Sequence, residues 1–364
     1  MFFVKDYIQK GSSHSDAVER CMRARKAVRK RETVVFSGQD FCLDRAVLIP
    51  SDTEIIIDGC TVTQENEVFD NIFRGDNLVI DPANPFGEPL EASTVENITI
   101  RAVNGGMIAG PEVRKKLFHP EFGEEQEAVG DFWGWRTFLI CLSLCKGFEI
   151  AGLVIRRTNC WAMSFDGCSY GYIHDIDIVS ECKNGDGIDF RAGCRHCRVK
   201  NITGYTSDDT VACTAQYSVY SPYPKGKYLY PLCPTRKLRS GSPEECNIED
   251  ITIEGIYTGG RHHAVICLCS GGAQVSHVRI KDVKETAEGE RECAVRIYTG
   301  YGNGYRDGDL HDISVDDVEC SVSALGVYCN TKVSNVKLGR IKCNNKGGQK
   351  FKLDFPDGII TEDF

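Results

Sequence analysis

A short strand pattern that recurs along the chain constrains the fold most. It reads apolar-x-Asn/Asp/His-apolar-x-apolar, and alternation of this kind is typical of a strand that buries one face. Clear copies occupy residues 173–178, 248–253, 275–280, 310–315 and 333–338. The third positions of the aligned copies, with a shorter copy around Asn201, are Asp175, Asn201, Asp250, His277, Asp312 and Asn335.

The spacing of these copies predicts a coiled architecture. The steps between the third positions are 26, 49, 27, 35 and 23 residues, and we interpret the step of 49 as two coils. Short strands at such a step, with turn residues between them, predict a parallel β-solenoid in which each coil stacks on the last. We therefore expect an all-β, single-stranded parallel β-helix that forms one domain over residues 1–364.

Three segments depart from the repeat. Residues 13–31 have helical spacing, a Ser/Asp start and no Gly or Pro, so we expect an N-terminal helix that caps the first coil. Residues 111–136 and 214–246 are long, aromatic-rich insertions. Long loops in a compact domain are usually functional or disordered, and aromatic content argues against disorder. We expect these insertions to form walls of a cleft; plain packing on the flank of the solenoid is the alternative.

Charge and hydropathy exclude two classes of partner. The net charge is −9, whereas a nucleic-acid surface needs concentrated Lys and Arg. No apolar stretch approaches the ~20 residues of a membrane span. The start of the chain lacks the charged and apolar regions of a secretory signal peptide. We therefore expect no nucleic acid, no membrane and a cytoplasmic location, with secretion only if the start has been trimmed.

The 19 cysteines fit the same compartment. In a reducing cytosol, free cysteine packs as a small hydrophobic residue, and many of these thiols fall in strand-like runs. Cys194 and Cys197 have the spacing of half a zinc site, but no second such pair stands at a suitable distance. We expect packed thiols and no bound metal.

Acids, a histidine and an arginine are spaced along the string of strand patterns. Asp186 precedes the pair Asp208-Asp209 by about one coil, and His263 and Arg296 follow. Carboxylates one coil apart would stack on one face, and carboxyl groups gathered on one face are what acid/base cleavage of a glycosidic bond requires. Other acids in the repeat, such as Asp189 and Asp175, are expected only to satisfy turns.

These residues carry a resemblance to glycoside hydrolase family 28, the polygalacturonase family, over roughly residues 140–340. The family has Asn-Thr-Asp-Gly, Gly-Asp-Asp, Gly-His-Gly and Arg-Ile-Lys in this order. The corresponding segments here are Asn184-Gly185-Asp186-Gly187, Ser207-Asp208-Asp209, Arg261-His262-His263-Ala264 and Arg296-Ile297-Tyr298. The resemblance implies a right-handed parallel β-helix of the pectin-lyase-like superfamily.

The resemblance also implies roles for individual residues. Asp208 would be the general acid, Asp186 and Asp209 would position and deprotonate water, and His263 would tune the acid or bind substrate. Carboxyl groups of inverting glycosidases lie ~6.5–9.5 Å apart. Arg296 would bind substrate charge or hydroxyls.

Two further substrate-binding candidates border these motifs. His262 stands next to the motif histidine, and Tyr298 occupies the place of the family lysine, which weakens the case for strict galacturonate recognition.

The resulting functional prediction is an inverting glycosidase. It would act without a cofactor on pectin-derived or related oligosaccharides or polysaccharides. Another sugar-active β-helix enzyme, a lyase or an epimerase, and a non-catalytic carbohydrate-binding solenoid remain open. The sugar, the linkage, exo or endo action and the oligomeric state are not determined by the sequence.

Overall fold

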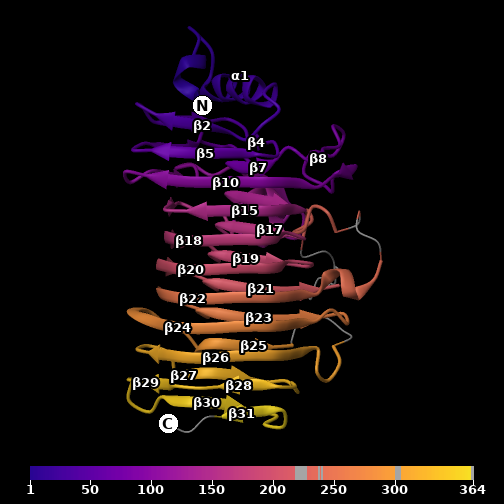
Figure 1. Ribbon diagram of the computed structural model, residues 1–364, viewed down its shortest axis with the longest axis vertical. Coiled ribbons are helices and arrows are strands. Elements are labelled where there is room, and N and C mark those ends of the chain that lie inside the picture. Colours follow the sequence, from indigo (N-terminus) through magenta and orange to yellow (C-terminus); the bar gives the residue numbers. More distant parts are fainter. Residues whose placement is uncertain (218–227, 237, 239–240, 300–304, 362–364) are drawn as a thin grey trace.

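In the computed structural model, the chain winds into a stack of parallel coils, and helix α1 (His14–Lys26) lies over the first of them (Figure 1). The structure describes residues 1–217, 228–236, 238, 241–299 and 305–361. The described residues form a parallel β-helix with two long sheets, as the repeat predicts.

The larger sheet has 17 strands that pair in parallel in two tracks. From β18 onward most coils join the two tracks into a single long, bent strand. The strands are β1 (Phe2–Phe3), β2 (Glu32–Ser37), β3 (Phe41–Leu43), β5 (Thr53–Asp58), β6 (Thr61–Gln64), β10 (Val95–Val103), β11 (Met107–Ala109), β15 (Cys145–Ala151), β16 (Val154–Arg156), β18 (Ser169–Ser180), β20 (Arg195–Thr206), β22 (Ile248–Gly260), β24 (Val275–Gly289), β26 (Leu310–Cys320), β28 (Val336–Leu338), β29 (Ile341–Cys343) and β31 (Ile359–Thr361).

The smaller sheet has ten strands, one from most coils, and it forms the opposite wall of the solenoid. Its strands are β4 (Val47–Ile49), β7 (Phe73–Gly75), β14 (Ile140–Ser143), β17 (Met163–Asp166), β19 (Ile188–Arg191), β21 (Val211–Gln216), β23 (Val265–Ser270), β25 (Cys293–Tyr298), β27 (Leu325–Cys329) and β30 (Gln349–Leu353).

Two hairpins and four 3-10 helices lie outside the two long sheets. Two antiparallel hairpins pair β8 (Leu78–Val79) with β9 (Glu91–Ala92) and β12 (Lys116–His119) with β13 (Glu124–Glu127). The 3-10 helices are η1 (Val4–Tyr7), η2 (Asp131–Trp133), η3 (Trp135–Thr137) and η4 (Pro243–Cys246). The predicted insertion 111–136 contains the second hairpin and η2. Much of the insertion 214–246 lies outside the described residues.

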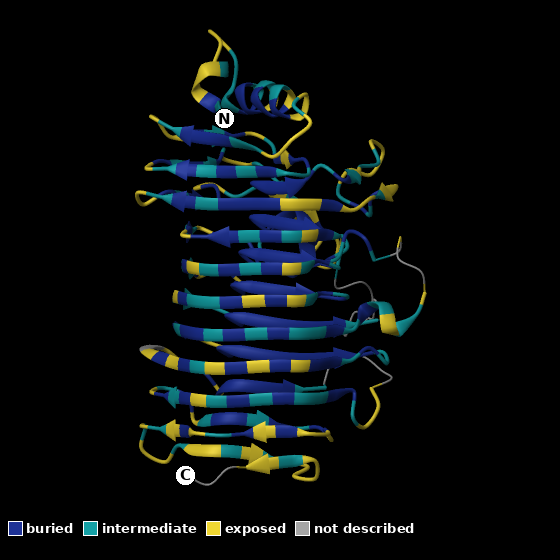
Figure 2. Cartoon of the chain, viewed as in Figure 1, coloured by how far each residue is buried: buried dark blue, intermediate teal, exposed yellow. Residues whose placement is uncertain are grey.

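The core fills the space between the two sheets. Buried residues recur along the strands from coil to coil, whereas β30 and β31 of the last coil contain only half-buried and exposed residues (Figure 2). Like residues stack from coil to coil. The rings of Phe148, Phe165 and Phe190 stack at centroid distances of 4.7 and 5.7 Å. The cysteines are all free, and all are buried except the half-buried Cys42, Cys233 and Cys343.

The Cys-x-x-Cys pair does not form half a zinc site. Both thiols are buried in the core, where Cys194 Sγ donates to Phe165 O at 3.1 Å and Cys197 Sγ donates to Arg195 O at 3.2 Å. Neither thiol belongs to a cluster of possible metal ligands within the described residues.

The polar third positions of the repeat adopt the left-handed conformation. Their φ angles lie between 51° and 55°, a region that Asn and Asp tolerate better than other non-glycine residues. In this conformation a side-chain amide can hydrogen-bond to the neighbouring coil: Asn201 Nδ2 donates to Asp175 Oδ1 of the preceding coil at 2.9 Å. The recurring Asn/Asp/His therefore marks a bend in the chain, with a strand on either side.

The interpretation of the 49-residue step as two coils is wrong. Strand β20 pairs directly with β22, with Arg195 opposite Glu249 and Lys200 opposite Glu254, so one coil spans 54 residues and carries the second insertion. Asp250 therefore stacks on His196, and Gly255 stacks on Asn201. Each long strand has two bends, five residues apart, and each bend stacks on the corresponding bend of the next coil. The sequence alignment placed residues from the first bend and residues from the second bend in one series.

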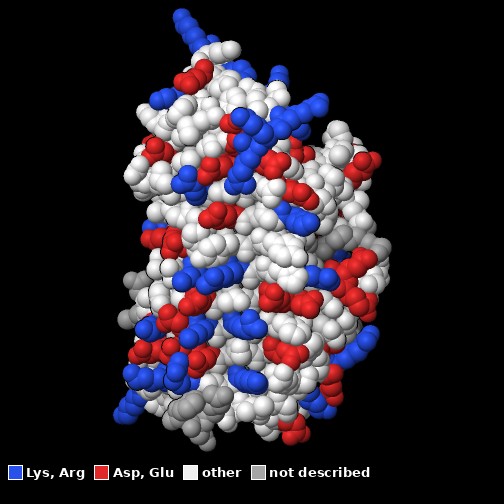
Figure 3. Space-filling view, in the orientation of Figure 1, with Lys and Arg blue, Asp and Glu red and all other residues white. Residues whose placement is uncertain are grey.

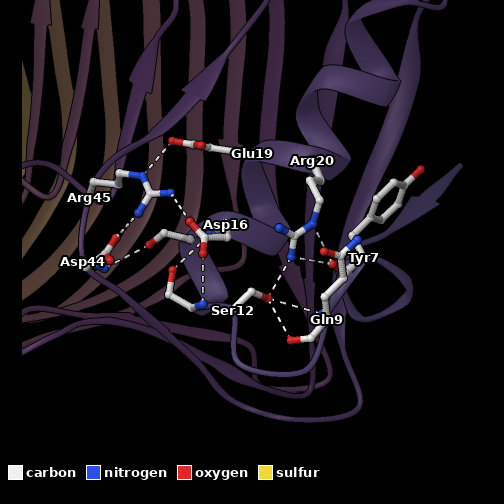
Figure 4. A network of polar contacts seen from close by, with 10 residues as sticks. Tyr7, Gln9, Ser12, Asp16, Glu19, Arg20, Asp44 and Arg45 are labelled. Carbon is white, nitrogen blue, oxygen red and sulfur yellow. Dashed lines mark hydrogen bonds and ion pairs between the residues drawn. The ribbon is translucent and has the colours of Figure 1, made fainter.

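Helix α1 caps the first coil and ends earlier than predicted, at Lys26. Ser13 and Asp16 form a capping box at its start. Arg45 then fastens the helix to the coil below, with ion pairs to Asp16 at 2.7 Å and Glu19 at 2.6 Å (Figure 4). The buried side chains of the helix face the coil, as a solenoid cap requires.

The face of the molecule that the larger sheet forms carries both signs of charge. Lys and Arg side chains alternate there with Asp and Glu (Figure 3). Pairs such as Arg198 with Glu254 at 3.5 Å and Lys342 with Glu319 at 3.4 Å join neighbouring coils. No helix among the described residues has the length and apolar character needed to cross a membrane.

Candidate active site

A cleft of about 720 Å³ lies on the outer face of the smaller sheet. Strands β19, β21, β23 and β25 form its floor, because alternate residues of each strand point away from the core. The first insertion contributes Asp131 to the lining, and the second contributes Tyr228 and Leu232. All seven predicted site residues line this cleft: Asp186, Asp208, Asp209, His262, His263, Arg296 and Tyr298.

Asp186, Asp209 and His263 occupy equivalent positions of three successive coils. Each stands two residues before its strand, β19, β21 or β23. Backbone hydrogen bonds stack these turns, from Gly187 N to Asp209 O and from Thr210 N to His263 O, both at 2.9 Å. The coil-like spacing of Asp186 and Asp209, and the 54-residue coil that carries the second insertion before His263, bring these side chains together.

Gly187 explains why glycine follows Asp186. A Cβ at this position would lie 2.5 Å from the carbonyl oxygen of Thr210, which is closer than a carbon atom can approach. The absent side chain lets the Asp186 turn sit directly on the Asp209 turn.

The three acids are packed more tightly than the expected spacing of ~6.5–9.5 Å. One carboxylate oxygen each of Asp186, Asp208 and Asp209 lies within 4.8 Å of the others. The reason is the stacking of Asp186 and Asp209 on adjacent coils, which are about 4.8 Å apart. Two oxygens that accept from one water at about 2.8 Å each lie about 4.5 Å apart, which falls within this limit.

Burial and the closeness of the other acids raise the pKa of both Asp208 and Asp186. Burial and the neighbouring Asp209 raise the pKa of Asp208 to about 8. Burial and the charge of Asp208 hold the pKa of Asp186 well above its usual value. Within the described residues, Asp186 Oδ1 is buried without a hydrogen-bond partner, so it can bind a water or a substrate hydroxyl.

His263 is paired with Asp209. Its Nδ1 lies 2.7 Å from Asp209 Oδ1, and its backbone N–H donates to the same oxygen at 3.1 Å. Burial lowers the pKa of His263, but the charge and hydrogen bond of Asp209 outweigh burial and raise the pKa to about 10. At neutral pH, His263 is therefore an imidazolium beside Asp209. His262, more exposed, places its Nδ1 3.4 Å from Asp208 Oδ1.

A buried polar network supports the Asp208-Asp209 turn from behind. The hydroxyl of Thr206 donates to Asp208 O at 3.0 Å and lies 2.8 Å from the hydroxyl of Thr210. The guanidinium of Arg291 donates to Thr210 Oγ1 at 3.0 Å and to Thr258 O at 2.9 Å. The network holds the turn that carries both acids.

Arg296 lies on β25, and aromatic rings hold its guanidinium in the cleft. The guanidinium carbon lies 3.6 Å from the ring centroid of Tyr328 and 4.8 Å from that of Tyr298. One nitrogen lies 3.5 Å from Glu292 Oε2. Tyr298 thus packs against the arginine.

The assignment of Asp189 to a turn is wrong. Asp189 lies in strand β19, is 1% exposed and lines the cleft together with Arg191 and Trp161. Neither Arg191 nor Trp161 was predicted as a site residue. The signal was present in the alternation Ile188-Asp189-Phe190-Arg191, which places Asp189 and Arg191 on the outer face of the sheet.

Two groups of side chains bring possible metal-ligating atoms within 4.8 Å of one another. They are Asp186, Asp208 and Asp209, and Asp209, His262 and His263. Both groups belong to the same cluster, and three carboxylates of this kind suit a hard cation. A chelator therefore belongs in any assay of the site.

A right-handed parallel β-helix with a carboxylate-rich cleft on one sheet is the class of protein that the fold and the site define. No protein-family model and no curated protein sequence matches the chain. Among solved structures, it is similar to a family 28 exopolygalacturonase of Yersinia enterocolitica, with a TM-score of 0.55, 12% identity and coverage of 97% of this chain and 77% of that chain.

Two further structures have a similar fold. An exopolygalacturonase of Thermotoga maritima matches with a TM-score of 0.55, 12% identity and coverage of 99% of this chain and 91% of that chain. A tailspike protein mutant of E. coli bacteriophage HK620, in complex with a pentasaccharide, matches with a TM-score of 0.59, 9% identity and coverage of 99% and 63%. At these identities, the similarity establishes the fold alone.

Proposed function

We propose that this protein is a glycoside hydrolase that cleaves O-glycosidic bonds in pectin-derived or related oligosaccharides by an inverting acid/base mechanism. The observation that carries the proposal is the cluster of Asp186, Asp208 and Asp209 in the cleft, where Asp208 has a pKa of about 8. The names of the similar structures, two of them exopolygalacturonases, agree with this reaction class.

Asp208 is the general acid in this proposal. A carboxyl with a pKa of about 8 carries its proton at neutral pH and can give it to the leaving oxygen. His262 lies beside it and can hydrogen-bond the substrate. The hydroxyl of Thr206 donates to the main-chain oxygen of Asp208 and so holds the turn that carries this carboxyl.

Water activation falls to the two stacked acids. Asp209, which is hydrogen-bonded to His263, accepts the proton of the attacking water. Asp186, with its unpartnered buried oxygen, positions that water. The separation of these acids accommodates a water between them, and attack from there on the face opposite the leaving group inverts the anomeric carbon.

Arg296 binds an acidic group of the substrate. Its planar guanidinium matches a carboxylate in a bidentate manner, and the rings of Tyr298 and Tyr328 fix its position. A substrate with at least one uronic acid unit fits this end of the cleft.

The test is to incubate the protein with acidic, methyl-esterified and neutral pectic oligosaccharides in water labelled with the heavy oxygen isotope. The products are then analysed by mass spectrometry. Hydrolysis places one heavy oxygen on the new reducing end, and turnover persists with a chelator present. Asp208→Asn is the matched variant, and it should bind without turnover.

Other outcomes would contradict the proposal in distinct ways. A product with an unsaturated, ultraviolet-absorbing end and no heavy oxygen would indicate a lyase. Epimerised but uncleaved sugar would indicate an epimerase. Binding without turnover, unchanged in Asp208→Asn, would indicate a carbohydrate-binding solenoid.

A further inference from the structure

Two cysteines face each other near the end of the stack that is far from helix α1 (Figure 1). Cys320 is the last residue of β26 and Cys343 is the last residue of β29, and the two are partners in the parallel pairing of these strands. Adjacent strands lie about 4.8 Å apart, and paired side chains of parallel strands point to the same face. The two Cα atoms therefore stand within the range of about 4.4–6.8 Å that disulfides span.

The two thiols contact each other but differ in their access to solvent. Cys320 is buried, whereas Cys343 is half-buried and its Sγ donates to Gln349 O at 3.1 Å. Burial raises the pKa of both thiols, and the hydrogen bond between them raises the pKa of Cys320 further and lowers that of Cys343. Glu285 also raises the pKa of both thiols, while Lys350 lowers that of Cys343. Cys343 is therefore the thiol of the pair that ionises first and that an external reagent reaches.

A second pair of cysteines has the same register but no access to solvent. Cys213 on β21 and Cys267 on β23 are partners in the smaller sheet, and their thiols are hydrogen-bonded to each other. Both are fully buried in the core, in the middle of their strands. A disulfide requires the Cβ atoms to approach to about 3.8 Å, and a residue at the end of a strand, such as Cys343, moves this far more easily than one inside a sheet.

A bond between Cys320 and Cys343 would close a ring of one coil. The ring holds residues 321–342, which include β27 and β28. Strand β30 pairs with β27 and strand β31 pairs with β28, so the last coil rests on this ring. Both β30 and β31 contain only half-buried and exposed residues, and the described residues after η4 form no further helix that could cover them. Few buried contacts make this end the part of the stack that opens most easily.

We propose that Cys320 and Cys343 form a reversible disulfide under oxidising conditions and that this bond fastens the last coil to the stack. The inference is independent of the proposed hydrolase function, because neither cysteine lines the cleft. The strands hold the two Cβ atoms further apart than a disulfide prefers, and a bond closed against such a spacing is readily reduced again.

A small-molecule disulfide such as oxidised glutathione supplies the oxidising equivalents. The thiolate of Cys343 attacks one of its sulfur atoms, forms a mixed disulfide and releases one glutathione thiolate. The thiol of Cys320 then gives its proton to solvent and attacks the sulfur of Cys343, which releases the second glutathione as a thiolate. Two protein thiols are oxidised, and one molecule of oxidised glutathione becomes two molecules of reduced glutathione.

Peptide mapping tests the bond. Reduced protein is incubated with oxidised glutathione, its remaining thiols are blocked with a maleimide, and it is digested without reductant for mass spectrometry. We expect one internal disulfide, between Cys320 and Cys343, which reduced glutathione reverses. Cys343→Ser should abolish the bond and leave Cys320 unmodified, because Cys320 is buried. The matched control is Cys42→Ser, which removes a half-buried thiol that stands opposite Thr63 and should leave the bond unchanged.

Hydrogen exchange tests the effect of the bond on the fold. In the oxidised protein, the amides of β29, β30 and β31 should exchange more slowly than in the reduced protein by a factor on the order of 10 to 100. The amides of β19 and β21 in the cleft should keep their rates. Cys343→Ser treated in the same way should show no slowing in any of these strands.

Three results would overturn the proposal. A lasting glutathione adduct on Cys343 with Cys320 still reduced would exclude the disulfide, and so would equally rapid oxidation of Cys213 and Cys267, which would show that access does not select the pair. A disulfide between Cys320 and Cys343 without slower exchange in β30 and β31 would exclude its role in fastening the last coil.

Discussion

At the residue scale, the account depends on the proton of Asp208. Asp208→Asn keeps the size of the side chain but cannot deliver a proton, and general acid catalysis contributes on the order of 10²–10⁴ in rate. We expect kcat to fall by about 10⁴ with little change in substrate affinity, measured by steady-state kinetics and calorimetry. Asp175→Asn, at an exposed bend of the larger sheet, is the matched control and should be fully active. A rate of Asp208→Asn near that of the control would remove the proposed acid.

The same substitution should make the protein more stable than the wild type, by a margin that grows as pH rises. The pKa of Asp208 is raised to about 8 in the folded protein, and about 3.9 is usual for an unfolded chain. A raised folded pKa means that stability is lost as pH rises between these values, because burying the ionised acid is unfavourable.

The gain should therefore depend on pH. We expect the free energy of unfolding of Asp208→Asn, measured with denaturant, to exceed that of the wild-type protein by only a small margin at pH 4. At pH 8 the difference should be on the order of 2–4 kcal/mol. The activity of the wild-type protein should fall above pH 8 as Asp208 ionises. A constant difference in stability across this range would contradict the assignment.

The residues of the site were predictable where they stood in turns, and less so where they stood in strands. Asp186 and Asp209 recur one coil apart, so spacing predicted their stacking, whereas His263 follows a coil of 54 residues and was identified through the motif resemblance. Asp189 and Arg191 alternate with core residues in a four-residue strand, too short for its period to be distinguished from a turn.

At the scale of elements, left-handed bends decide where strands turn. The sequence repeat identified the residues of the bends but merged two columns, because both carry Asn or Asp before an apolar residue. The insertion in one coil then looked like an extra coil. Register could be assigned only once β20 was seen to pair with β22.

The left-handed bends give a prediction about stability. Asn201 has φ of 54°, and a β-branched residue there costs about 1–2 kcal/mol in addition to the lost hydrogen bond to Asp175. We expect Asn201→Val to lower the free energy of unfolding by about 2–3 kcal/mol, and Asn201→Gly to lower it by less. Thr203→Val, an exposed position of the same strand without positive φ, is the control. Equal effects at residues 201 and 203 would contradict the role of the bend.

At the scale of the whole molecule, cysteines serve as core residues. All 19 are free, and only Cys42, Cys233 and Cys343 are half-buried. With the protein made in a reducing cytosol, we expect at most three thiols to react quickly with a thiol reagent in the native state, and all 19 after unfolding without reductant. Rapid native reaction of many thiols would contradict the packed core, and fewer than 19 after unfolding would reveal disulfides.

The cleft runs across neighbouring coils of the parallel β-helix. In the proposed function, a bound oligosaccharide would therefore contact residues of successive coils. The Asp186 turn precedes β19, the Asp208-Asp209 turn precedes β21, the His263 turn precedes β23, and Arg296 lies on β25. Both insertions line this cleft, and the segment around residues 84–88 lines a second pocket that shares residues with it. The repeat predicted the stack, but only the three-dimensional structure relates the insertions to one end of the site.

The most direct measurement is the anomeric configuration of the first product. Wild-type protein is mixed with α-linked trigalacturonate, and proton NMR spectra are recorded before mutarotation equilibrates the anomers. The account predicts that the β-anomer of the new reducing end appears first, because water between Asp186 and Asp209 attacks opposite the bond that Asp208 protonates. Early release of the α-anomer, or the signal of an unsaturated uronate, would contradict it.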